Sequence, residues 1–250
     1  MAKVVILAGG FGKRLRPLTL DKPKPLVEVA GRPIIEWQIL HFRSLGYRDF
    51  VVLAGYRWEK LVEHLGSGRR LGVRIAYVVE DEPLGTGGAI KNAEHLLADE
   101  DYFFVVNGDV VTNLDARRLP ERLAESQGSL VGAIALVPLR SPYGIVEVDN
   151  SGLIERFVEK PTLDYWINAG VYALTPEVFR WLPEKGDIER HGFPQLASQK
   201  RLAGVGFRDA YWRSIDTVKD VEEATTQLRE ADWAQRLNQL APPRAHEEQE

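Results

Sequence analysis

Residues 6–17 read Ile-Leu-Ala-Gly-Gly-Phe-Gly-Lys-Arg-Leu-Arg-Pro, and residues 23–26 read Pro-Lys-Pro-Leu. The segment from Lys3 to Leu7, in front of the glycines, predicts a buried strand. Three glycines then turn the chain, and because they lack a Cβ their N–H groups can approach an anion closely. Two prolines hold Lys24 on a stiff, extended segment. Together these features predict a cradle for a polyphosphate after the first strand.

Two common phosphate-binding motifs do not fit this stretch. The P-loop requires Lys followed by Ser or Thr, but Lys13 is followed by Arg14. The dinucleotide fingerprint requires a glycine three residues after Gly12, where this chain has Leu15. An ordinary glycine-rich turn with exposed basic residues remains the alternative interpretation.

Composition narrows the class of protein. The 250 residues suffice for one large α/β domain or two small ones, and the net charge of -4 predicts no general affinity for nucleic acid. The chain contains no cysteine, which excludes disulfides and a cysteine nucleophile. No apolar run reaches membrane-span length or resembles a signal peptide, so a cytoplasmic protein without a membrane partner is expected. One methionine, no cysteine and many Arg, Glu and Pro residues are typical of a thermophile.

Strand and helix patterns alternate through the first half of the chain. Apolar segments at 50–54, 73–79, 102–106 and 130–137 predict strands, and amphipathic segments at 34–45, 58–65, 89–97 and 115–126 predict helices. Thr86 is expected to cap the helix at 89–97. This alternation predicts an α/β fold with a mainly parallel sheet flanked by helices, and ligands at the carboxyl ends of the strands.

Two further loops fall at such strand ends. Glu80 to Ala89 contains Leu-Gly-Thr-Gly-Gly, whose glycines leave room for a flat ligand, although a plain strand-to-helix loop is as compatible. Asn107-Gly108-Asp109 places a carboxylate directly after a buried strand, which suits a hard cation such as Mg²⁺. Asp at a turn is otherwise common as a backbone cap.

The pattern changes after residue 138. Asp149-Asn150-Ser151-Gly152 lies between apolar segments at 143–148 and 153–158, which predicts a hairpin. Strands are expected at 166–174 and 202–207, short helices at 176–181 and 191–198, and a helix from Thr217 through Leu228 and on to Leu240. One domain is therefore expected over 1–230, with halves at about 1–138 and 139–230. Residues 231–250 are expected to form the helix end and a disordered tail.

The motifs together resemble those of the sugar-1-phosphate nucleotidyltransferases, also called nucleotide-sugar pyrophosphorylases. The likeness rests on Leu-Ala-Gly-Gly-Phe-Gly-Lys-Arg with Pro-Lys-Pro-Leu, on Leu-Gly-Thr-Gly-Gly, on Asn-Gly-Asp, and on Glu159-Lys160-Pro161, and it spans roughly residues 3 to 225. It is nearest to the mannose- and heptose-1-phosphate guanylyltransferases. It implies a Rossmann-like, mostly parallel sheet of the nucleotide-diphospho-sugar transferase type, with a smaller antiparallel sugar-binding portion.

The resemblance also implies a reaction and its participants. An NTP and a sugar 1-phosphate, with Mg²⁺, give an NDP-sugar and pyrophosphate, and no protein nucleophile is required. Relatives often form dimers or tetramers, so the resemblance is also compatible with a homo-oligomer of this chain. The resemblance implies that the nucleotide is contacted by Leu7, Gly9, Gly10, Gly12, Glu80 and Gly85. It implies that the catalytic residues are Arg14, Lys24, Asp109 and Lys160, and that the metal is held by Asp109 and Asp216. The sugar pocket would be lined by Gly144, Glu159, Asn168 and Gly170.

The base and the sugar are less closely defined. Glu80 stands where thymidylyl- and uridylyl-transferring relatives commonly have glutamine, and an ionised carboxylate accepts both adjacent donors of guanine. GTP is therefore expected, and the resemblance favours mannose 1-phosphate as its partner. Glucose-1-phosphate thymidylyl- or uridylyltransfer is the alternative activity. The simplest alternative for Glu80 itself is a solvated loop charge. Asp-Thr-Val follows Ile215 in place of the more usual Asp-Gly-Thr-Pro, which weakens the match at Asp216. A non-catalytic regulatory subunit and a dinucleotide-dependent oxidoreductase are the alternatives of other classes.

Overall fold

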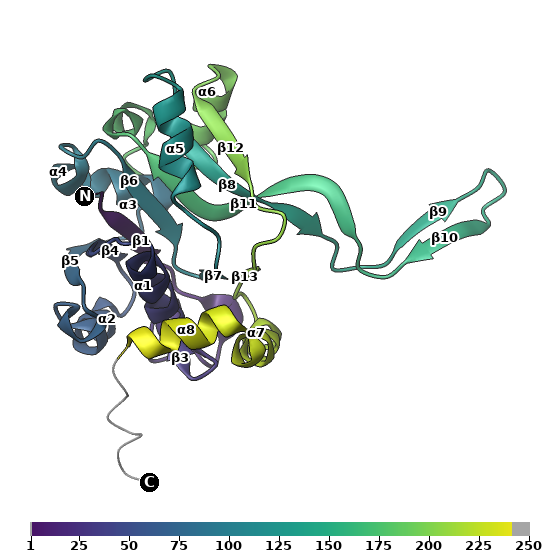
Figure 1. Cartoon of the computed structure of the whole chain (residues 1–250), viewed down its shortest axis with the longest axis horizontal. Coiled ribbons are helices and arrows are strands. Elements are labelled where there is room, and N and C mark those ends of the chain that lie inside the picture. The colour runs from purple at the N-terminus through teal and green to yellow at the C-terminus, as the bar shows by residue number, and fades with distance from the viewer. Residues whose placement is uncertain (1, 242–250) are drawn as a thin grey trace, which may run out of the picture.

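A computed structural model of the chain describes residues 2–241. Its centre is a seven-stranded sheet with the order β12-β8-β11-β6-β1-β4-β5, seen in Figure 1. The strands are β1 (Val4–Ala8), β4 (Asp49–Ala54), β5 (Arg74–Val79), β6 (Phe103–Asn107), β8 (Gly132–Arg140), β11 (Thr162–Leu174) and β12 (Leu202–Gly206). β11 is antiparallel to β6 and β8, and the other neighbouring strands are parallel. The predicted α/β, mostly parallel sheet is confirmed.

Helices cover both faces of this sheet because successive strand residues point to opposite sides. Val4 and Ile6 of β1 belong to one buried cluster and Val5 belongs to the other. The first cluster packs against α1 (Ile34–Ser44), α2 (Trp58–Leu65), α5 (Arg118–Glu125), α7 (Val218–Glu230) and α8 (Asp232–Leu240). The second packs against α3 (Gly85–Asn92), α4 (Glu94–Leu97), the 3-10 helix η4 (Pro176–Trp181) and α6 (Gly192–Ser198). The result is a three-layer domain.

Short elements outside the central sheet complete the fold. They are β2 (Glu28–Val29), β3 (Arg32–Pro33), β7 (Val110–Thr112), β13 (Trp212–Ser214), and the 3-10 helices η1 (Lys13–Leu15), η2 (Lys24–Leu26) and η3 (Arg69–Leu71). β13 pairs antiparallel with β7, with Ser214 opposite Val110. The N–H of Ile215 donates to the carbonyl of Asp109 at 2.8 Å. This pairing brings two distant parts of the sequence to the same edge of the sheet.

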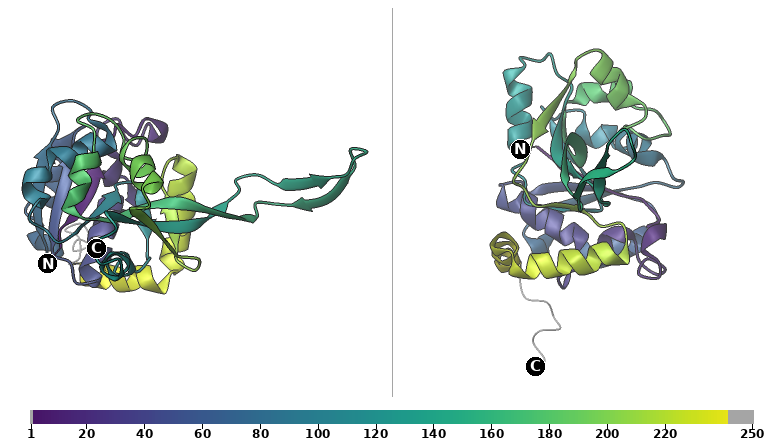
Figure 2. Two further views of the ribbon diagram at one scale, coloured as in Figure 1. Left: turned by 90° about the horizontal axis from the view of Figure 1, so that it is seen from above. Right: turned by 90° about the vertical axis from the view of Figure 1, so that its right-hand side faces the viewer.

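The predicted hairpin is present and stands apart from the sheet. β9 (Ile145–Val148) and β10 (Ile154–Val158) pair antiparallel around the Asp149–Gly152 turn. We call residues 141–161 the arm. The left view of Figure 2 shows that the arm projects well beyond the three-layer body. The second half of the chain otherwise contributes β8, β11 and β12 to the same central sheet.

Two predictions about helices are wrong. The helix expected at 89–97 begins at Gly85, whose φ is +76°, so Thr86 lies inside it and is not its cap. The helix expected to continue from Thr217 to Leu240 is interrupted at Ala231, which has an extended conformation. The second segment turns there to pack on α1, where the rings of Trp37 and Trp233 lie 6.3 Å apart. The predicted Thr217 cap is confirmed as a capping box with Asp220.

Two other sequence predictions concern the C-terminal tail and membrane-spanning segments. Most of the predicted tail, residues 242–250, lies outside the described residues. Among the helices of residues 2–241, none has the length and apolar character needed to span a bilayer.

Candidate active site

A cavity of about 300 Å³ opens at the carboxyl ends of β1, β4, β5 and β6. Its walls are formed by the loops that follow β1, β5 and β6. These are the three loops that the sequence predicts to bind a ligand. Seven of the predicted site residues line it: Leu7, Gly9, Gly10, Lys24, Glu80, Gly85 and Asp109. Parallel strands end at one edge of a sheet, and this places all three loops around a single space.

Gly12 holds the glycine-rich loop in place although it does not line the cavity. Its φ of +58° favours glycine, and a Cβ there would lie 3.0 Å from the Cβ of Lys24 and from the side chain of Thr19. The hydroxyl of Thr19 donates to the Gly12 carbonyl at 2.8 Å. Gly12 therefore allows the loop to close against the segment that carries Lys24.

Gly108 permits an equally close contact between β1 and the loop after β6. Its N–H donates to the carbonyl of Leu7 at 3.0 Å. A Cβ at this position would collide with the same carbonyl oxygen. The glycine of Asn-Gly-Asp thus brings Asp109 to the first strand and to the glycine-rich loop.

Four charged side chains meet beside this cavity. Nζ of Lys24 donates to Oδ2 of Asp109 at 2.7 Å and to Oδ1 of Asp216 at 2.8 Å. The guanidinium of Arg14, whose side chain is largely exposed, donates to the same oxygen of Asp216 at 2.8 Å. Burial alone would raise the pKa of Asp216, but Lys24, Ser214 and Arg14 lower it below its usual value. Asp216 is therefore suited to remain ionised, and Asp109 faces the same ammonium group.

The two carboxylates also match the chemistry of a magnesium site. Mg²⁺ prefers oxygen ligands and is usually held by one or two carboxylates together with substrate phosphates and water. Asp109 and Asp216 both contact one cationic atom, Nζ of Lys24. Within residues 2–241, no group of three or more His, Cys, Asp or Glu residues forms a metal cage. The residues fit a metal that is shared with a phosphate ligand.

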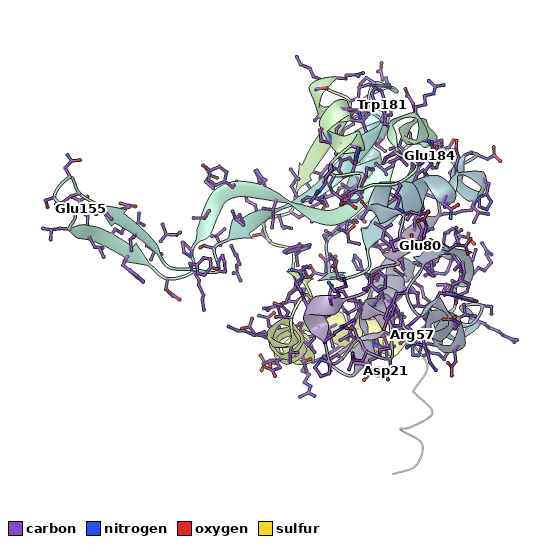
Figure 3. The ribbon with its side chains drawn as sticks, turned by 180° about the vertical axis from the view of Figure 1, so that it is seen from behind. Asp21, Arg57, Glu80, Glu155, Trp181 and Glu184 are labelled. Carbon is purple, nitrogen blue, oxygen red and sulfur yellow. The ribbon has the colours of Figure 1, made fainter. Side chains whose placement is uncertain are left out.

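Glu80 lines the cavity and lies against the bare backbone of two glycines. A Cβ at Gly9 or at Gly55 would collide with its Oε1, and Figure 3 shows Glu80 within the body of the domain. Its Oε2 accepts a hydrogen bond from the N–H of Leu84 at 3.2 Å. Burial raises the pKa of Glu80, and this hydrogen bond offsets part of that effect. The carboxylate is thus a wall of the cavity, in contrast to the simplest expectation of a solvated charge.

One lining residue that the sequence did not suggest is Asp187. Its Oδ1 accepts from the N–H of Thr86 at 3.3 Å, and the hydroxyl of Thr86 donates to Glu189 at 2.6 Å. The N–H groups of Gly87 and Gly88 donate to the carbonyl of Gly186. The loop after η4 is thereby bound to the start of α3. No local motif surrounds Asp187, so only the tertiary contact reveals it.

Asn168 and Gly170 lie close to the cavity but do not line it. The side chain of Asn168 donates to the Tyr172 hydroxyl at 2.9 Å and accepts from the Gly170 N–H at 2.8 Å. A Cβ at Gly170 would lie within 3 Å of the side chain of Asn107, a lining residue. The side-chain oxygen of Asn107 is buried and has no hydrogen-bond partner within the described part of the chain. That unpartnered oxygen lies beside the predicted sugar residues.

Gly144, Glu159 and Lys160 lie at the base of the arm and are separate from the cavity lining. A Cβ at Gly144 would lie 3.0 Å from Oε2 of Glu159. Lys160 lines a second, wider hollow of about 950 Å³ together with Arg140, Arg208 and Arg213. The structure thus keeps these three residues together, and their assignment to the sugar and its phosphate stays a prediction.

Comparison with known proteins identifies one family that this chain matches. Residues 3–231 match the model of a family described as nucleotidyl transferase. The mannose-1-phosphate guanyltransferase of Yarrowia lipolytica is 38% identical over 229 residues, which cover 89% of this chain and 63% of that protein. The same name applies to a protein of Kluyveromyces lactis that is 40% identical over 232 residues, again 89% and 63% of the two chains. This chain therefore spans less than two thirds of the length of these relatives.

A solved structure agrees with this result. HddC from Yersinia pseudotuberculosis, complexed with GMP-PN, has a TM-score of 0.69 and 28% identity, and the match covers 91% of this chain and 99% of that one. A nucleotide analogue is thus seen bound to a protein of the same fold.

Proposed function

This chain belongs to the nucleotidyl transferase family, and we propose that it transfers the guanylyl group of GTP to mannose 1-phosphate. The products are GDP-mannose and pyrophosphate. The observation that carries the proposal is the contact of Lys24 with both Asp109 and Asp216 beside a glycine-lined cavity. The names of the relatives and the guanosine analogue bound to HddC support guanine and mannose as the substrate groups.

The reaction needs charge stabilisation more than it needs a protein nucleophile. A phosphate oxygen of the sugar phosphate forms a bond to the α-phosphorus while the bond from that phosphorus to the bridging oxygen breaks. The electron pair of the broken bond leaves with pyrophosphate. Gly9 and Gly10 expose backbone that a triphosphate can approach, and Lys24 and Arg14 supply positive charge beside it. Arg14 is assigned to the leaving pyrophosphate, since its guanidinium contacts Asp216 and its side chain, 73% exposed, is free to contact a ligand.

Asp109 and Asp216 are the residues that would hold Mg²⁺. When bound, the ion would neutralise charge on the phosphate oxygens and help to align them. Lys24 contacts the same two carboxylates, so it shares them with the ion. Binding of the nucleotide would therefore draw the ammonium group of Lys24 toward the phosphates.

Glu80 is proposed to select the base. Guanine presents N1–H and an exocyclic amino group side by side, and one carboxylate can accept from both. Uracil and thymine present one N–H between two carbonyl oxygens, which a carboxylate repels. Replacement of Glu80 by Gln removes the charge and adds a donor. We expect Glu80→Gln to narrow the preference for GTP over UTP and dTTP by about 1–3 kcal/mol, the scale of a lost charged hydrogen bond.

The test compares specificity constants for four NTPs in the wild type and in this variant. Glu82→Gln is a matched control, because Glu82 lies in the same loop but pairs with Lys185 at the surface. It is expected to leave the ranking of the NTPs unchanged. A wild-type preference for UTP or dTTP would favour uridylyl or thymidylyl transfer. An unchanged ranking in Glu80→Gln would remove Glu80 from the base site.

A further inference from the structure

Gln38 is a buried polar residue of α1 that contacts the turn carrying Asp109. It is 4% exposed. Its side-chain nitrogen donates to the carbonyl of Asn107 at 2.8 Å and to the carbonyl of Val110 at 2.8 Å. These carbonyls belong to the residues immediately before and after Gly108-Asp109. Figure 1 shows α1 beside β7, the short strand that follows this turn. One helix side chain therefore holds both ends of the turn.

The chemistry of the amide determines which way this side chain faces. A primary amide nitrogen carries two hydrogens, so it can serve two acceptors at once. The reverse orientation of Gln38 would direct its Oε1 at two carbonyl oxygens, which can only accept. As placed, Oε1 is buried and has no hydrogen-bond partner within residues 2–241. A buried acceptor without a partner weakens the fold, so the two donated bonds are what Gln38 contributes.

The turn is connected to both carboxylates of the candidate metal site. It carries Asp109, whose backbone carbonyl accepts from the N–H of Ile215 at 2.8 Å. Val110 is opposite Ser214 in the pairing of β7 with β13. The hydroxyl of Ser214 in turn donates to Oδ2 of Asp216 at 2.9 Å. A displacement of the turn would therefore move Asp109 directly and Asp216 through β13.

A second polar residue of α1 holds the same segment further along the chain. Nε2 of His41 lies 2.8 Å from the carbonyl oxygen of Leu114, and because a carbonyl can only accept, the ring nitrogen is the donor. Gln38 and His41 are three residues apart, and residues at this spacing are neighbours on a helix surface. One side of α1 thus holds segment 107–114 at three backbone carbonyls.

We propose that Gln38 is a positioning residue for the metal site, and that its two hydrogen bonds fix Asp109 relative to Asp216. The inference rests on the proposed function, in which these carboxylates hold Mg²⁺ against the phosphates of an NTP. Mg²⁺ demands near-ideal octahedral geometry, so a displaced carboxylate binds it less well. Gln38 itself does not line the cavity and acts through Asp109. Loss of a residue that orients a metal ligand typically costs about 10–100-fold in metal affinity.

The effect of Mg²⁺ on nucleotide binding tests this role without turnover. Calorimetry gives the dissociation constant of the NTP that the wild type binds most tightly, first in EDTA and then with enough Mg²⁺ to saturate the NTP, and without sugar 1-phosphate. By linkage, the ratio of the two constants reports the gain in Mg²⁺ affinity when the NTP is bound to the protein. Gln38→Met keeps the side-chain length and removes both donors. Its ratio is expected to fall about tenfold, while its NTP affinity in EDTA matches that of the wild type.

Further variants separate positioning from a general loss of stability. Trp37→Phe removes another buried hydrogen bond of α1, from Nε1 to the carbonyl of Val29 at 2.9 Å, and should leave the ratio unchanged. Asp109→Asn removes the carboxylate through which Gln38 is proposed to act, so the addition of Gln38→Met should lower the ratio no further. If Gln38→Met does not fold, Gln38→Asn, which keeps the donors on a shorter side chain, should show a smaller fall in the ratio.

Three results would overturn the role of Gln38 and leave the proposed function in place. They are an unchanged ratio in the Gln38 variants, an equal loss of NTP affinity with and without Mg²⁺, and a further fall in the ratio when Gln38→Met is added to Asp109→Asn. A wild type that binds none of the four NTPs, or binds them equally with and without Mg²⁺, would contradict the proposed function itself, and the role of Gln38 would be rejected with it.

Discussion

Lys24→Met tests whether the ammonium group holds Asp109 and Asp216 together. The change keeps most of the side-chain volume and removes the charge. The side chains of Lys24, Asp109 and Asp216 are 14%, 29% and 24% exposed. Their ion pairs are therefore intermediate between exposed and buried pairs. Exposed pairs are worth about 0–1 kcal/mol, and removal of one partner of a buried pair costs about 3–5 kcal/mol. We therefore expect a loss of about 2 kcal/mol in the free energy of unfolding.

For a domain of this size that loss corresponds to a melting midpoint about 4–8 °C lower. Two carboxylates without their lysine should bind Mg²⁺ better than the wild type does without nucleotide. Mg²⁺ at ten times its dissociation constant would restore about 1.4 kcal/mol.

Differential scanning calorimetry with and without Mg²⁺ measures both effects. Lys13→Met is the control, because Lys13 is exposed in the same region of the chain and contacts Phe11. An unchanged midpoint in Lys24→Met, or equal stabilisation of the wild type and the variant by Mg²⁺, would show that Lys24 does not hold the two carboxylates together.

Other single substitutions probe the metal site, the sugar phosphate and the buried histidine. Asp109→Asn should lower turnover by ~10²–10³, as for loss of one stabilising contact in a transition state, and pyrophosphate release above half the wild-type rate would contradict the metal assignment. Lys160→Ala should weaken the use of sugar 1-phosphate more than NTP binding, and a comparable loss of NTP affinity by calorimetry would show that Lys160 has been misassigned. Burial lowers the pKa of His41 to about 4, although the Leu114 carbonyl opposes this shift. Between pH 6.5 and 4 the unfolded state then binds more protons, so stability should fall as the pH falls, by about 3 kcal/mol. In His41→Gln, the free energy of unfolding measured with urea should not show this decrease. The same pH dependence in the variant as in the wild type would contradict the prediction.

Local motifs predicted much of the fold and the centre of the site. The glycine-rich loop and Asn-Gly-Asp each follow a strand, and β1 and β6 are neighbours, so two motifs about a hundred residues apart in sequence line one cavity. Strand positions followed from apolar runs, because buried parallel strands need apolar residues on both faces.

Other features depended on contacts that no local pattern encodes. Asp216 reaches Lys24 because β13 pairs with β7, and Asp187 lines the cavity because its loop binds the start of α3. The hairpin turn was predictable, but its projection was not. The local sequence sets the pairing of β9 with β10 but does not determine whether the hairpin packs on the body or projects from it.

Pyrophosphate release from a matrix of four NTPs and a panel of sugar 1-phosphates tests the central claim most directly. We expect the highest specificity constant for GTP with mannose 1-phosphate, and no release when either substrate is omitted. A higher specificity constant for UTP or dTTP, or no release with any pair, would contradict it.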